Sequence, residues 1–366
     1  MKVLSLFDGM ACGMLAMQKA GIEVDRYVAY EIDKYAVQTS THNFPVIEHR
    51  GDVFCADFTE FADFDFLVGG SPCTYWSVAK SVGRETEASG MGWELFRQYV
   101  RALHEAKPKF FVYENNKSMS KAIRASIDEA FGFEAIGINS ALVSAQNRQR
   151  LYWVGKRNDD GTYSRVKVEQ PEDRGILLKD ILESGAKDRE RIDSTVTTPV
   201  CLNSKSGRGG VEGLQPSLQN RIYSIDGKHP AVTAAYMPKI AEPVYVGTMP
   251  RPSGELSTSQ AFRAYCVNGK SVGLTAASGE AGGKTYSVYE VKDGQITING
   301  KTYPIKLTDG FYIIRKLTVK ECMRLQTVPE WYEFPVSNTQ AFEMLGNGWT
   351  CSIIQHLLEA CLRSGT

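Results

Sequence analysis

The sequence has no Cys-x-x-Cys pair and no cysteine–histidine spacing typical of zinc sites, although it contains eight cysteines. It also lacks an apolar run long enough to span a membrane and a leader with the pattern of a secretory signal. These absences exclude a disulfide-dense secreted scaffold and argue against a structural metal. We therefore expect a protein of the cytoplasm, a reducing compartment, with no metal and no membrane partner.

Net charge is absent as well, because 42 Lys and Arg residues balance 42 Asp and Glu residues. The balance is uneven: residues 1–100 carry 8 basic and 14 acidic side chains, so the remainder carries a net charge of +6. Overall charge therefore does not indicate a nucleic-acid partner, but it permits a basic face in the later part of the chain. The 366 residues, 43% of them apolar, are enough for one large domain or two moderate ones.

Residues 1–155 alternate between short apolar runs and segments with apolar residues at helical spacing. This alternation predicts an α/β fold with a doubly wound, mostly parallel sheet. The expected strands are 2–7, 26–31, 64–68, 110–113, 133–138 and 151–154. The expected helices are 10–20, 33–44, 93–106 and 119–131, with two more near the end of the chain at 318–326 and 350–362.

The composition changes near residue 190, where Thr, Ser, Gly and Pro become frequent and helical spacing disappears. Two segments 42 positions apart, 221–234 and 263–276, share Arg-x-Tyr, an Asp- or Asn-Gly-Lys turn and a Thr-Ala end. Such turns are typical of β-hairpins, and we interpret the pair as a duplication, against a chance similarity of turn sequences. The sequence predicts an α/β domain formed by residues 1–190 and 313–366, with a smaller β-rich domain, residues 191–312, inserted into it.

Cys73 follows the apolar run 64–68 and two glycines, within Gly-Gly-Ser-Pro-Cys. The glycines permit a sharp turn, and Pro72 restricts the backbone just before the thiol. The carboxyl end of a parallel strand is where open α/β sheets bind their ligands. A lone cysteine is more often a small buried apolar residue, so a reactive role for Cys73 depends on its neighbours.

Acidic residues stand at the ends of three successive expected strands. Asp8 begins a glycine-containing turn after the first strand, Glu31 ends the second, and Asp52 ends a third. Acidic side chains at such strand ends commonly bind ribose hydroxyls, whereas Asp33 better fits a helix N-cap. Because the first turn is not Gly-x-Gly-x-x-Gly, the pattern favours a nucleoside-containing cofactor without a pyrophosphate group.

Two further polar clusters flank expected strands. One is a Glu-Asn pair after strand 110–113, at the same sheet edge as the Pro-Cys turn, and its alternative is a surface acid that caps the next helix. The other is Gln-x-Arg-x-Arg before strand 151–154, where alternation places three side chains on one side of an extended chain; its alternative is a solvated edge strand. The residues of the two clusters are Glu114, Asn115, Gln146, Arg148 and Arg150.

Taken in order, these motifs resemble those of the cytosine carbon-5 DNA methyltransferases. The likeness covers nearly all of residues 1–155 and 313–366, and the ordered Pro-Cys, Glu-Asn and Gln-x-Arg-x-Arg set is highly specific. The insert and the size are similar to bacterial or phage stand-alone enzymes, while Ser-Pro-Cys, Phe-Asp-Gly and Gly-Asn-Gly-Trp are similar to the animal de novo branch. The matching motifs are Phe7-Asp8-Gly9 with Gly13, Glu31, Gly51-Asp52, Gly70-Ser71-Pro72-Cys73, Glu114-Asn115, Gln146-x-Arg148-x-Arg150, Arg315 to Gln326, and Leu345-Gly346-Asn347.

This resemblance implies a class I fold that binds S-adenosylmethionine and acts on a cytosine in double-stranded DNA. In such enzymes a thiolate adds to carbon-6 of a cytosine flipped out of the duplex, which activates carbon-5. Cys73 is then the nucleophile, and Glu114 stabilises the adduct at ring N3. Arg150 holds the oxygen on carbon-2, Arg148 supports the loop or Glu114, and Asn115 orients the turn that carries the thiol.

The resemblance also implies contacts with cofactor and DNA. Glu31 is expected to bind the ribose and Asp52 the adenine amino group. The full set of expected cofactor residues is Phe7, Asp8, Gly9, Gly13, Glu31, Asp52, Pro72, Asn347 and Trp349. Residues 77–93 match a mobile loop over the flipped base, and the insert takes the place of a target-recognition domain. The candidate DNA contacts, whose alternative is ordinary surface charge, are Lys80, Arg84, Ser89, Arg221, Lys228, Arg263 and Lys270.

Asn116 departs from the family, which usually has an apolar residue after Glu-Asn, and this puts the packing beneath the loop in doubt. Methylation of RNA cytosine is disfavoured, because the tRNA-directed branch lacks so large an insert and carries a Cys-Phe-Thr signature. An amino-directed DNA methyltransferase would have Pro-Pro instead of Pro-Cys, and an inert relative would be expected to lose Cys73 or Glu114. We expect a monomer that methylates DNA, as in restriction-modification, without a cleavage domain.

Overall fold

The computed structural model describes residues 1–77, 82–183, 222–224, 229–230, 239–243, 288–298, 301–305, 307 and 309–365. These residues fall into two compact units. The first unit comprises Met1–Ile176 and Val319–Thr366, and the second unit comprises the described residues between Leu177 and Thr318.

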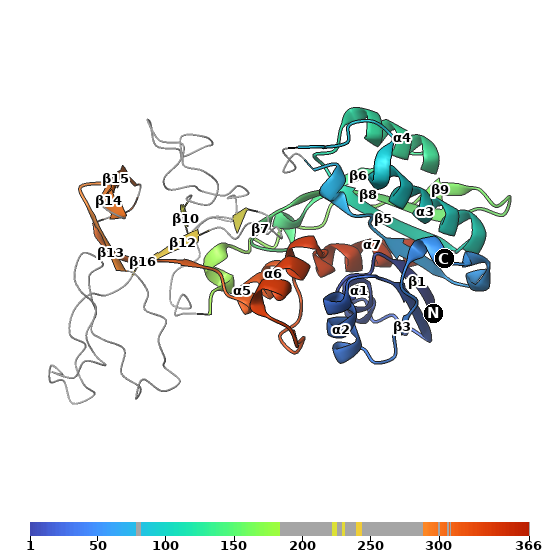
Figure 1. The fold of residues 1–366 in the computed structure, drawn as a ribbon, viewed down its shortest axis with the longest axis horizontal. Helices are drawn as coiled ribbons and strands as arrows, with labels where there is room; N and C mark the ends of the chain where they lie inside the picture. Colours follow the sequence, from blue (N-terminus) through green and yellow to red (C-terminus); the bar gives the residue numbers. More distant parts are fainter. Residues whose placement is uncertain are drawn as a thin grey trace. The chain divides into compact units, whose positions relative to one another are not determined.

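Among the described residues, a sheet of eight strands forms the frame of the first unit (Figure 1). Its order is β3-β2-β1-β4-β5-β8-β6, and β9 pairs with β8. Neighbours from β3 through β5 are parallel, whereas β8 runs antiparallel to β5, β6 and β9. This is the predicted mostly parallel sheet. The strands of the first unit are β1 (Lys2–Leu6), β2 (Arg26–Tyr30), β3 (Glu48–His49), β4 (Phe66–Gly69), β5 (Phe110–Asn116), β6 (Ile136–Asn139), β7 (Gln146–Asn147), β8 (Gln149–Arg157) and β9 (Tyr163–Arg165).

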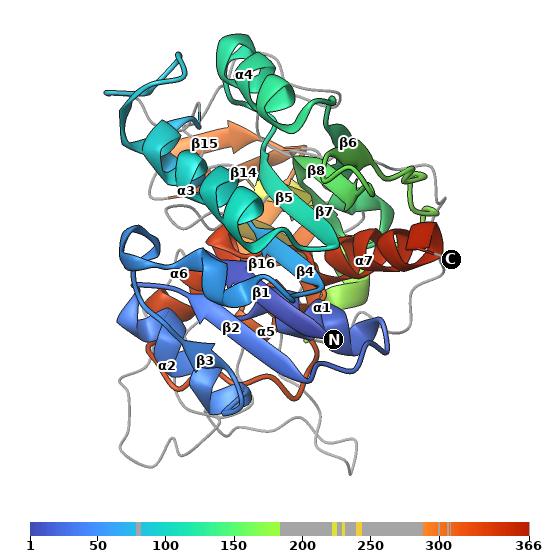
Figure 2. The ribbon, with the colours of Figure 1, turned by 90° about the vertical axis from the view of Figure 1, so that its right-hand side faces the viewer.

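Helices cover both faces of this sheet, with α3 and α7 on opposite sides of β4 and β5 (Figure 2). The α-helices are α1 (Cys12–Lys19), α2 (Lys34–Asn43), α3 (Gly90–Ala106), α4 (Lys121–Phe131), α5 (Val319–Leu325), α6 (Asn338–Asn347) and α7 (Cys351–Gly365). The 3₁₀ turns are η1 (Val53–Cys55), η2 (Phe58–Phe61), η3 (Cys73–Tyr75), η4 (Ser140–Leu142) and, in the second unit, η5 (Leu178–Ile181).

Side chains alternate along β5 so that both faces of the sheet bury apolar groups. Phe111 enters an aromatic cluster with Tyr99 of α3 and Phe131 of α4. The preceding Phe110 lies on the other face, where its ring approaches Gly365 of α7. A strand that is buried on both faces is apolar throughout, which is why the sequence showed these strands as continuous apolar runs.

Two helix ends show how the local sequence sets the boundaries. Asp33 caps α2, since its carboxylate accepts hydrogen bonds from the backbone of Tyr35 and Ala36 at 2.8 and 2.9 Å, which confirms the N-cap expected there. Helix α6 was not predicted. Its start is a reciprocal capping box between Ser337 and Gln340, a pattern that was visible in the sequence.

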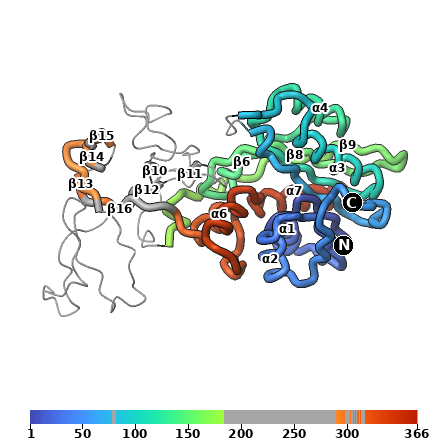
Figure 3. Tube along the Cα trace, in the orientation of Figure 1, coloured from blue at the N-terminus to red at the C-terminus, as the bar shows by residue number. Residues whose placement is uncertain are grey.

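The end of the chain returns to its beginning (Figure 3). Helix α7 packs against α1 and also contacts β5 and β8. In the interior, the Tyr332 hydroxyl donates to the Met10 carbonyl at 2.7 Å. The carboxyl-terminal segment therefore belongs to the same compact unit as β1.

The second unit holds a sheet with the order β10-β12-β16-β13-β14-β15. A tight turn at Asp293-Gly294 joins β13 to β14, and both residues have positive φ, as in a type I′ hairpin turn. The segments 221–234 and 263–276 lie largely outside the described residues, so the duplication and the domain boundaries at 190 and 312 stay predictions. The strands outside the first unit are β10 (Ile222–Ser224), β11 (His229–Pro230), β12 (Lys239–Pro243), β13 (Val288–Lys292), β14 (Gln295–Ile298), β15 (Lys301–Pro304) and β16 (Gly310–Lys316).

Candidate active site

A cavity of about 230 Å³ lies in the first unit, where β1, β2, β4 and β5 end. Its wall combines the turn after β1, the turn after β4, the end of β5 and the segment from α6 to Trp349. Most of the predicted site residues meet there. Those that line the cavity are Phe7, Asp8, Gly9, Glu31, Pro72, Cys73, Glu114, Arg148, Arg150, Asn347 and Trp349.

Cys73 begins the short η3 turn directly after β4 and is partly exposed. Its carbonyl accepts hydrogen bonds from the backbone N–H groups of Trp76 and Ser77 at 3.1 and 2.9 Å. The turn before it is fixed by Asn115, whose side-chain amide donates to the Ser71 carbonyl at 3.2 Å. The thiol is therefore presented on a turn whose backbone is bonded on both sides.

Asn116 has a structural partner in this turn. Its side-chain amide donates to the Cys73 carbonyl at 3.4 Å, and its own side-chain oxygen accepts from Ser118 at 2.7 Å. The residue that departs from the family pattern is thus buried and hydrogen-bonded to the backbone of the residue that carries the thiol.

Glu114 is buried in the last part of β5, which extends further than the predicted strand 110–113. One carboxylate oxygen, Oε1, pairs with Arg150 Nε at 3.0 Å. The other, Oε2, accepts a hydrogen bond from Trp349 Nε1 at 3.0 Å. The carboxylate is therefore held between a cation and a neutral donor on the wall that it shares with Cys73.

The two arginines of the Gln-x-Arg-x-Arg motif have different partners. Arg150 is bonded to Glu114, as described above. Arg148 is only 3% exposed and donates to the carbonyls of Gly346 and Gly348 at 3.0 and 2.9 Å. Burial, together with the nearby charge of Arg150, lowers the pKa of Arg148 to about 10, so it remains charged at neutral pH.

Carboxylates line the side of the cavity next to β1 and β2. Glu31 accepts hydrogen bonds from the backbone N–H of Gly9 through one oxygen and from Ile32 and Asp33 through the other, each at 2.8 Å. It thereby fixes the turn after β1 against the turn after β2.

Asp8 is buried and only half satisfied. Its Oδ1 accepts from the hydroxyls of Ser5 and Tyr27 at 2.6 and 2.7 Å, whereas its buried Oδ2 has no hydrogen-bond partner. Burial disfavours the carboxylate and raises the pKa of Asp8 to about 6.

Two expected cofactor residues lie outside the cavity wall. Gly13 is within α1, where an added Cβ would lie 2.5 Å from the Tyr27 hydroxyl, so this glycine permits close packing of the helix on β2. Asp52 is exposed and caps η1 through a hydrogen bond from Phe54 N at 2.9 Å. Sequence reasoning also missed several lining residues, in part because α6 was not foreseen: Met10, Tyr35, Ala36, Gln340, Glu343 and Met344.

Few of the expected DNA contacts fall within the described residues. Arg84 donates to the carbonyls of Trp76 and Ser118 at 3.0 and 2.7 Å, which ties the loop after Cys73 to the body of the unit. Ser89 is exposed just before α3. The others lie outside the described residues: Lys80, Arg221, Lys228, Arg263 and Lys270.

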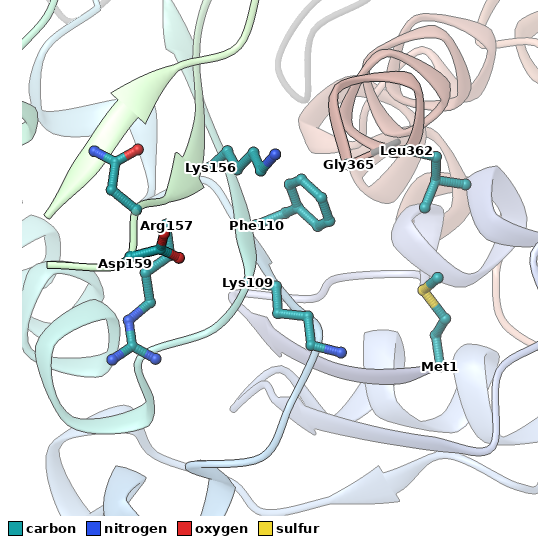
Figure 4. A pocket seen from close by; sticks show the side chains of 9 residues that line it. Met1, Lys109, Phe110, Lys156, Arg157, Asp159, Leu362 and Gly365 are labelled. Atoms are coloured by element: carbon teal, nitrogen blue, oxygen red, sulfur yellow. The ribbon is translucent and has the colours of Figure 1, made fainter. Parts of the chain in front are cut away.

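A second hollow lies at the opposite end of β5 (Figure 4). Its two lysines already have partners, since Lys109 pairs with Asp65 at 2.7 Å and Lys156 donates to the Ser364 carbonyl at 2.6 Å. In the described part of the chain we find no group of His, Cys, Asp or Glu that could hold a metal, and no helix that could cross a membrane.

The fold is similar to those of solved methyltransferase structures. The structure of the Schizosaccharomyces pombe Dnmt2 methyltransferase matches with a TM-score of 0.56 at 16% identity, covering 100% of this chain and 99% of that one. The Entamoeba histolytica methyltransferase EhMeth matches with a TM-score of 0.58 at 12% identity, covering 100% and 98%.

The family is narrower than the fold. The family model described as C-5 cytosine-specific DNA methylase matches residues 1–363, and the chain belongs to that family. The orphan methyltransferase M.SPRI of Bacillus phage SPR is 25% identical over 100% of this chain and 98% of its own length. The type II methyltransferase M1.ScrFI of Lactococcus lactis subsp. cremoris is 26% identical over 99% of this chain and 78% of its own. The protein is thus a DNA (cytosine-5-)-methyltransferase that uses S-adenosylmethionine.

The cavity fits this cofactor. S-adenosylmethionine carries a positive sulfonium and a positive ammonium group, and the cavity wall includes five carboxylates, those of Asp8, Glu31, Asp33, Glu114 and Glu343. The unpartnered oxygen of Asp8 is a buried acceptor that a cationic ligand can satisfy. At Gly9 an added Cβ would meet nothing within 4 Å, so the backbone there borders open space.

Proposed function

We propose that Cys73 is the nucleophile of cytosine methylation, and that Glu114 and Arg150 bind the base that it attacks. The observation that carries this proposal is the arrangement of the three side chains on one cavity wall, with the Glu114 carboxylate already paired to the Arg150 guanidinium. Asn115 positions the thiol by holding the preceding turn through the Ser71 carbonyl. Arg148 acts indirectly, because it binds the backbone carbonyls of Gly346 and Gly348.

The proposed chemistry follows from the weak nucleophilicity of cytosine carbon-5. The Cys73 thiolate forms a bond to carbon-6, and the electron pair of the carbon-5–carbon-6 double bond becomes available at carbon-5. Glu114 stabilises this adduct by sharing a proton with ring N3, and Arg150 binds the oxygen on carbon-2. S-adenosylmethionine supplies the electrophilic methyl group. Loss of the carbon-5 proton to a base then restores the double bond and expels the Cys73 thiolate.

The proposed cofactor contacts begin with those that line the cavity: Phe7, Asp8, Gly9, Glu31, Pro72, Asn347 and Trp349. We assign the ribose hydroxyls to Glu31. Asp52 remains our candidate for the adenine amino group, and its exposed position leaves the carboxylate accessible. Gly13 contributes indirectly, by allowing α1 to approach β2 closely.

We further propose double-stranded DNA as the substrate form, with the target cytosine flipped out of the stack. A base within the duplex cannot reach a thiol on a cavity wall, so extrusion has to precede the chemistry. The loop 77–93 and the insert 191–312, as a target-recognition domain, would bind the DNA. Their proposed contacts are Lys80, Arg84, Ser89, Arg221, Lys228, Arg263 and Lys270. We expect a monomer in the cytoplasm, where DNA and cofactor are both present.

The test of the nucleophile is the Cys73→Ser variant with a duplex that contains 5-fluorocytosine. Fluorine blocks the loss of the carbon-5 substituent, so the wild-type protein should accumulate a covalent complex that survives denaturation. The variant should form none, and its methylation rate on normal duplex should fall about a thousandfold or more. Cys55→Ser is the matched control, because Cys55 is exposed and outside the cavity. Full turnover by Cys73→Ser would refute the proposal.

A second experiment concerns the biological substrate. Bisulfite sequencing of host DNA after expression of the chain should reveal methylated cytosines within one short recognition sequence. Curated relatives are named both as orphan phage enzymes and as type II enzymes, so we propose a role in DNA modification of the restriction-modification kind. Methylation of tRNA without methylation of duplex DNA would contradict the double-stranded DNA assignment.

A further inference from the structure

Trp349 makes a contact that cofactor binding alone does not explain. It lies between α6 and α7 on the cavity wall, and its indole N–H donates to Glu114 Oε2 at 3.0 Å. We propose that Trp349 is a positioning residue for Glu114, which sets the carboxylate for the cytosine from the cofactor side of the cavity. This inference rests on the proposed role of Glu114 in binding the base.

The two bonds to Glu114 come from different donors to different oxygens. Arg150 Nε reaches Oε1 at 3.0 Å, and Trp349 Nε1 reaches Oε2 at 3.0 Å. One donor alone would leave the carboxylate free to turn about the bond that carries it, whereas two donors fix its plane. A carboxylate has about four lone-pair positions, so two remain: one to share a proton with ring N3 and one to accept from the exocyclic amino group of a cytosine. The indole is neutral, so it fixes the group without placing a second cation beside the base.

The backbone leading to Cys73 is shaped around this contact. At Gly70 an added Cβ would lie 2.8 Å from the Glu114 carbonyl oxygen, 3.0 Å from Glu114 Oε2 and 3.4 Å from Trp349 Nε1. Any side chain at this position would push on the carboxylate or on the indole. Gly70 therefore lets the thiol-bearing turn pass directly over the Trp349–Glu114 hydrogen bond.

Trp349 is itself held rigidly, which a positioning residue requires. Arg148 donates to the carbonyls of Gly346 and Gly348, just before the indole. On its other side, the Thr350 hydroxyl donates to the side-chain oxygen of Gln326 at 2.8 Å. A buried guanidinium is costly unless its donors are satisfied, and here two of its bonds fix this turn. Arg148 thus acts on Glu114 through Trp349, while Arg150 acts on it directly.

The test distinguishes a positioning role of Trp349 from the alternative that its ring only forms an apolar contact with the cofactor. Trp349→Phe keeps an aromatic ring and removes the N–H. Loss of a hydrogen bond to a charged group typically corresponds to about a tenfold change or somewhat more. We expect the rate of methyl transfer at saturating cofactor and DNA to fall about tenfold or more, and the dissociation constant of S-adenosylmethionine to stay within about twofold.

The matched control is Trp153→Phe. Trp153 Nε1 donates to Asp128 Oδ1 at 2.7 Å, so this variant loses the same kind of bond outside the cavity. Its transfer rate should equal that of the wild type, and thermal melting should confirm that both variants fold.

The same substitution made in a Glu114→Ala background supplies the decisive comparison. If Trp349 acts through Glu114, Trp349→Phe should cause no further loss of single-turnover rate once the carboxylate is gone. A further tenfold loss there, or a single variant that weakens cofactor binding at an unchanged rate, would overturn the inference. Neither result affects whether the wild-type protein forms a covalent complex with 5-fluorocytosine DNA. The proposed function is therefore tested separately from this inference.

Discussion

At the scale of single residues, the active site depends on a few buried polar groups with defined partners. Glu114, Arg148 and Asn115 are all nearly inaccessible to water, and each is hydrogen-bonded to a neighbour that carries or borders the cavity. Asp8 is the exception, because one of its buried oxygens has no partner. An unsatisfied buried acceptor destabilises the ligand-free protein and favours a ligand that can satisfy it.

This exception predicts a pH dependence of stability. The pKa of Asp8 is raised from 3.8 to about 6, so the folded state binds this proton more tightly than the unfolded state. The stabilisation from Asp8 is then complete below pH 4 and is lost as the pH rises through 6. Between pH 4 and pH 7, the free energy of unfolding of Asp8→Asn should therefore rise relative to that of the wild type by at most about 3 kcal/mol.

Urea unfolding of the cofactor-free protein at several pH values measures this difference. Asp52→Asn, at an exposed cap, should show no comparable gain with rising pH. If the difference in free energy of unfolding between the wild type and Asp8→Asn does not change with pH, Asp8 ionises normally in the folded protein.

At the scale of elements, β5 determines how the site is built. Its first residues pack into both faces of the sheet, and its last three residues carry Glu114, Asn115 and Asn116 to the cavity and the turn around Cys73. The strand that packs into the aromatic cluster therefore also fixes the position of the Glu114 carboxylate relative to the Cys73 thiol. The geometry at the end of β5 thus depends on how its earlier residues pack.

The packing prediction is made at Phe111. Its ring is fully buried and contacts Tyr99, Phe131, Phe133 and Tyr163. Phe111→Ala should lower the free energy of unfolding by about 3–5 kcal/mol, since it leaves a cavity in the aromatic cluster. Denaturant titration measures the loss, and Phe54→Ala at a half-exposed position should stay within about 1 kcal/mol of the wild type. A loss at Phe111 no larger than at Phe54 would mean that the cluster relaxes to fill the space.

At the scale of the whole molecule, the first unit is assembled from the two ends of the chain. Helix α7 lies against α1, and the connection between α6 and α7 supplies Trp349 to the cavity. The carboxyl-terminal segment is thus part of the core and of the site at once. The first unit should therefore unfold and refold as one cooperative structure.

Native-state hydrogen exchange tests this cooperativity. Leu357 of α7 is fully buried, and Leu357→Ala should remove about 2–5 kcal/mol of stability. We expect amides of α7 and of β1 to lose protection by the same amount, although more than 300 residues separate them in sequence. Loss of protection confined to α7 would indicate that the carboxyl-terminal segment unfolds on its own.

Much of the candidate site could be predicted from sequence because the residues that we propose for its chemistry stand at strand ends. The apolar runs before Asp8, Glu31, Cys73 and Glu114 identify strands, and parallel strands bring their carboxyl ends to one edge. The capping role of Asp33 followed from local hydrogen bonding alone. Helix α6 escaped prediction, and with it the lining residues Gln340, Glu343 and Met344.

The sequence by itself determined the order of most strands and helices in the first unit, the residues that we propose for the chemistry, and the family to which the chain belongs. These properties depend on local apolar spacing and on motifs that are contiguous in the chain. Only the tertiary structure decided that Arg148 supports residues 346–348 while Arg150 pairs with Glu114, and that Trp349 donates to the same carboxylate. Those contacts join residues up to 235 positions apart. Their partners are selected by burial and by the geometry of the folded core, which no local pattern records.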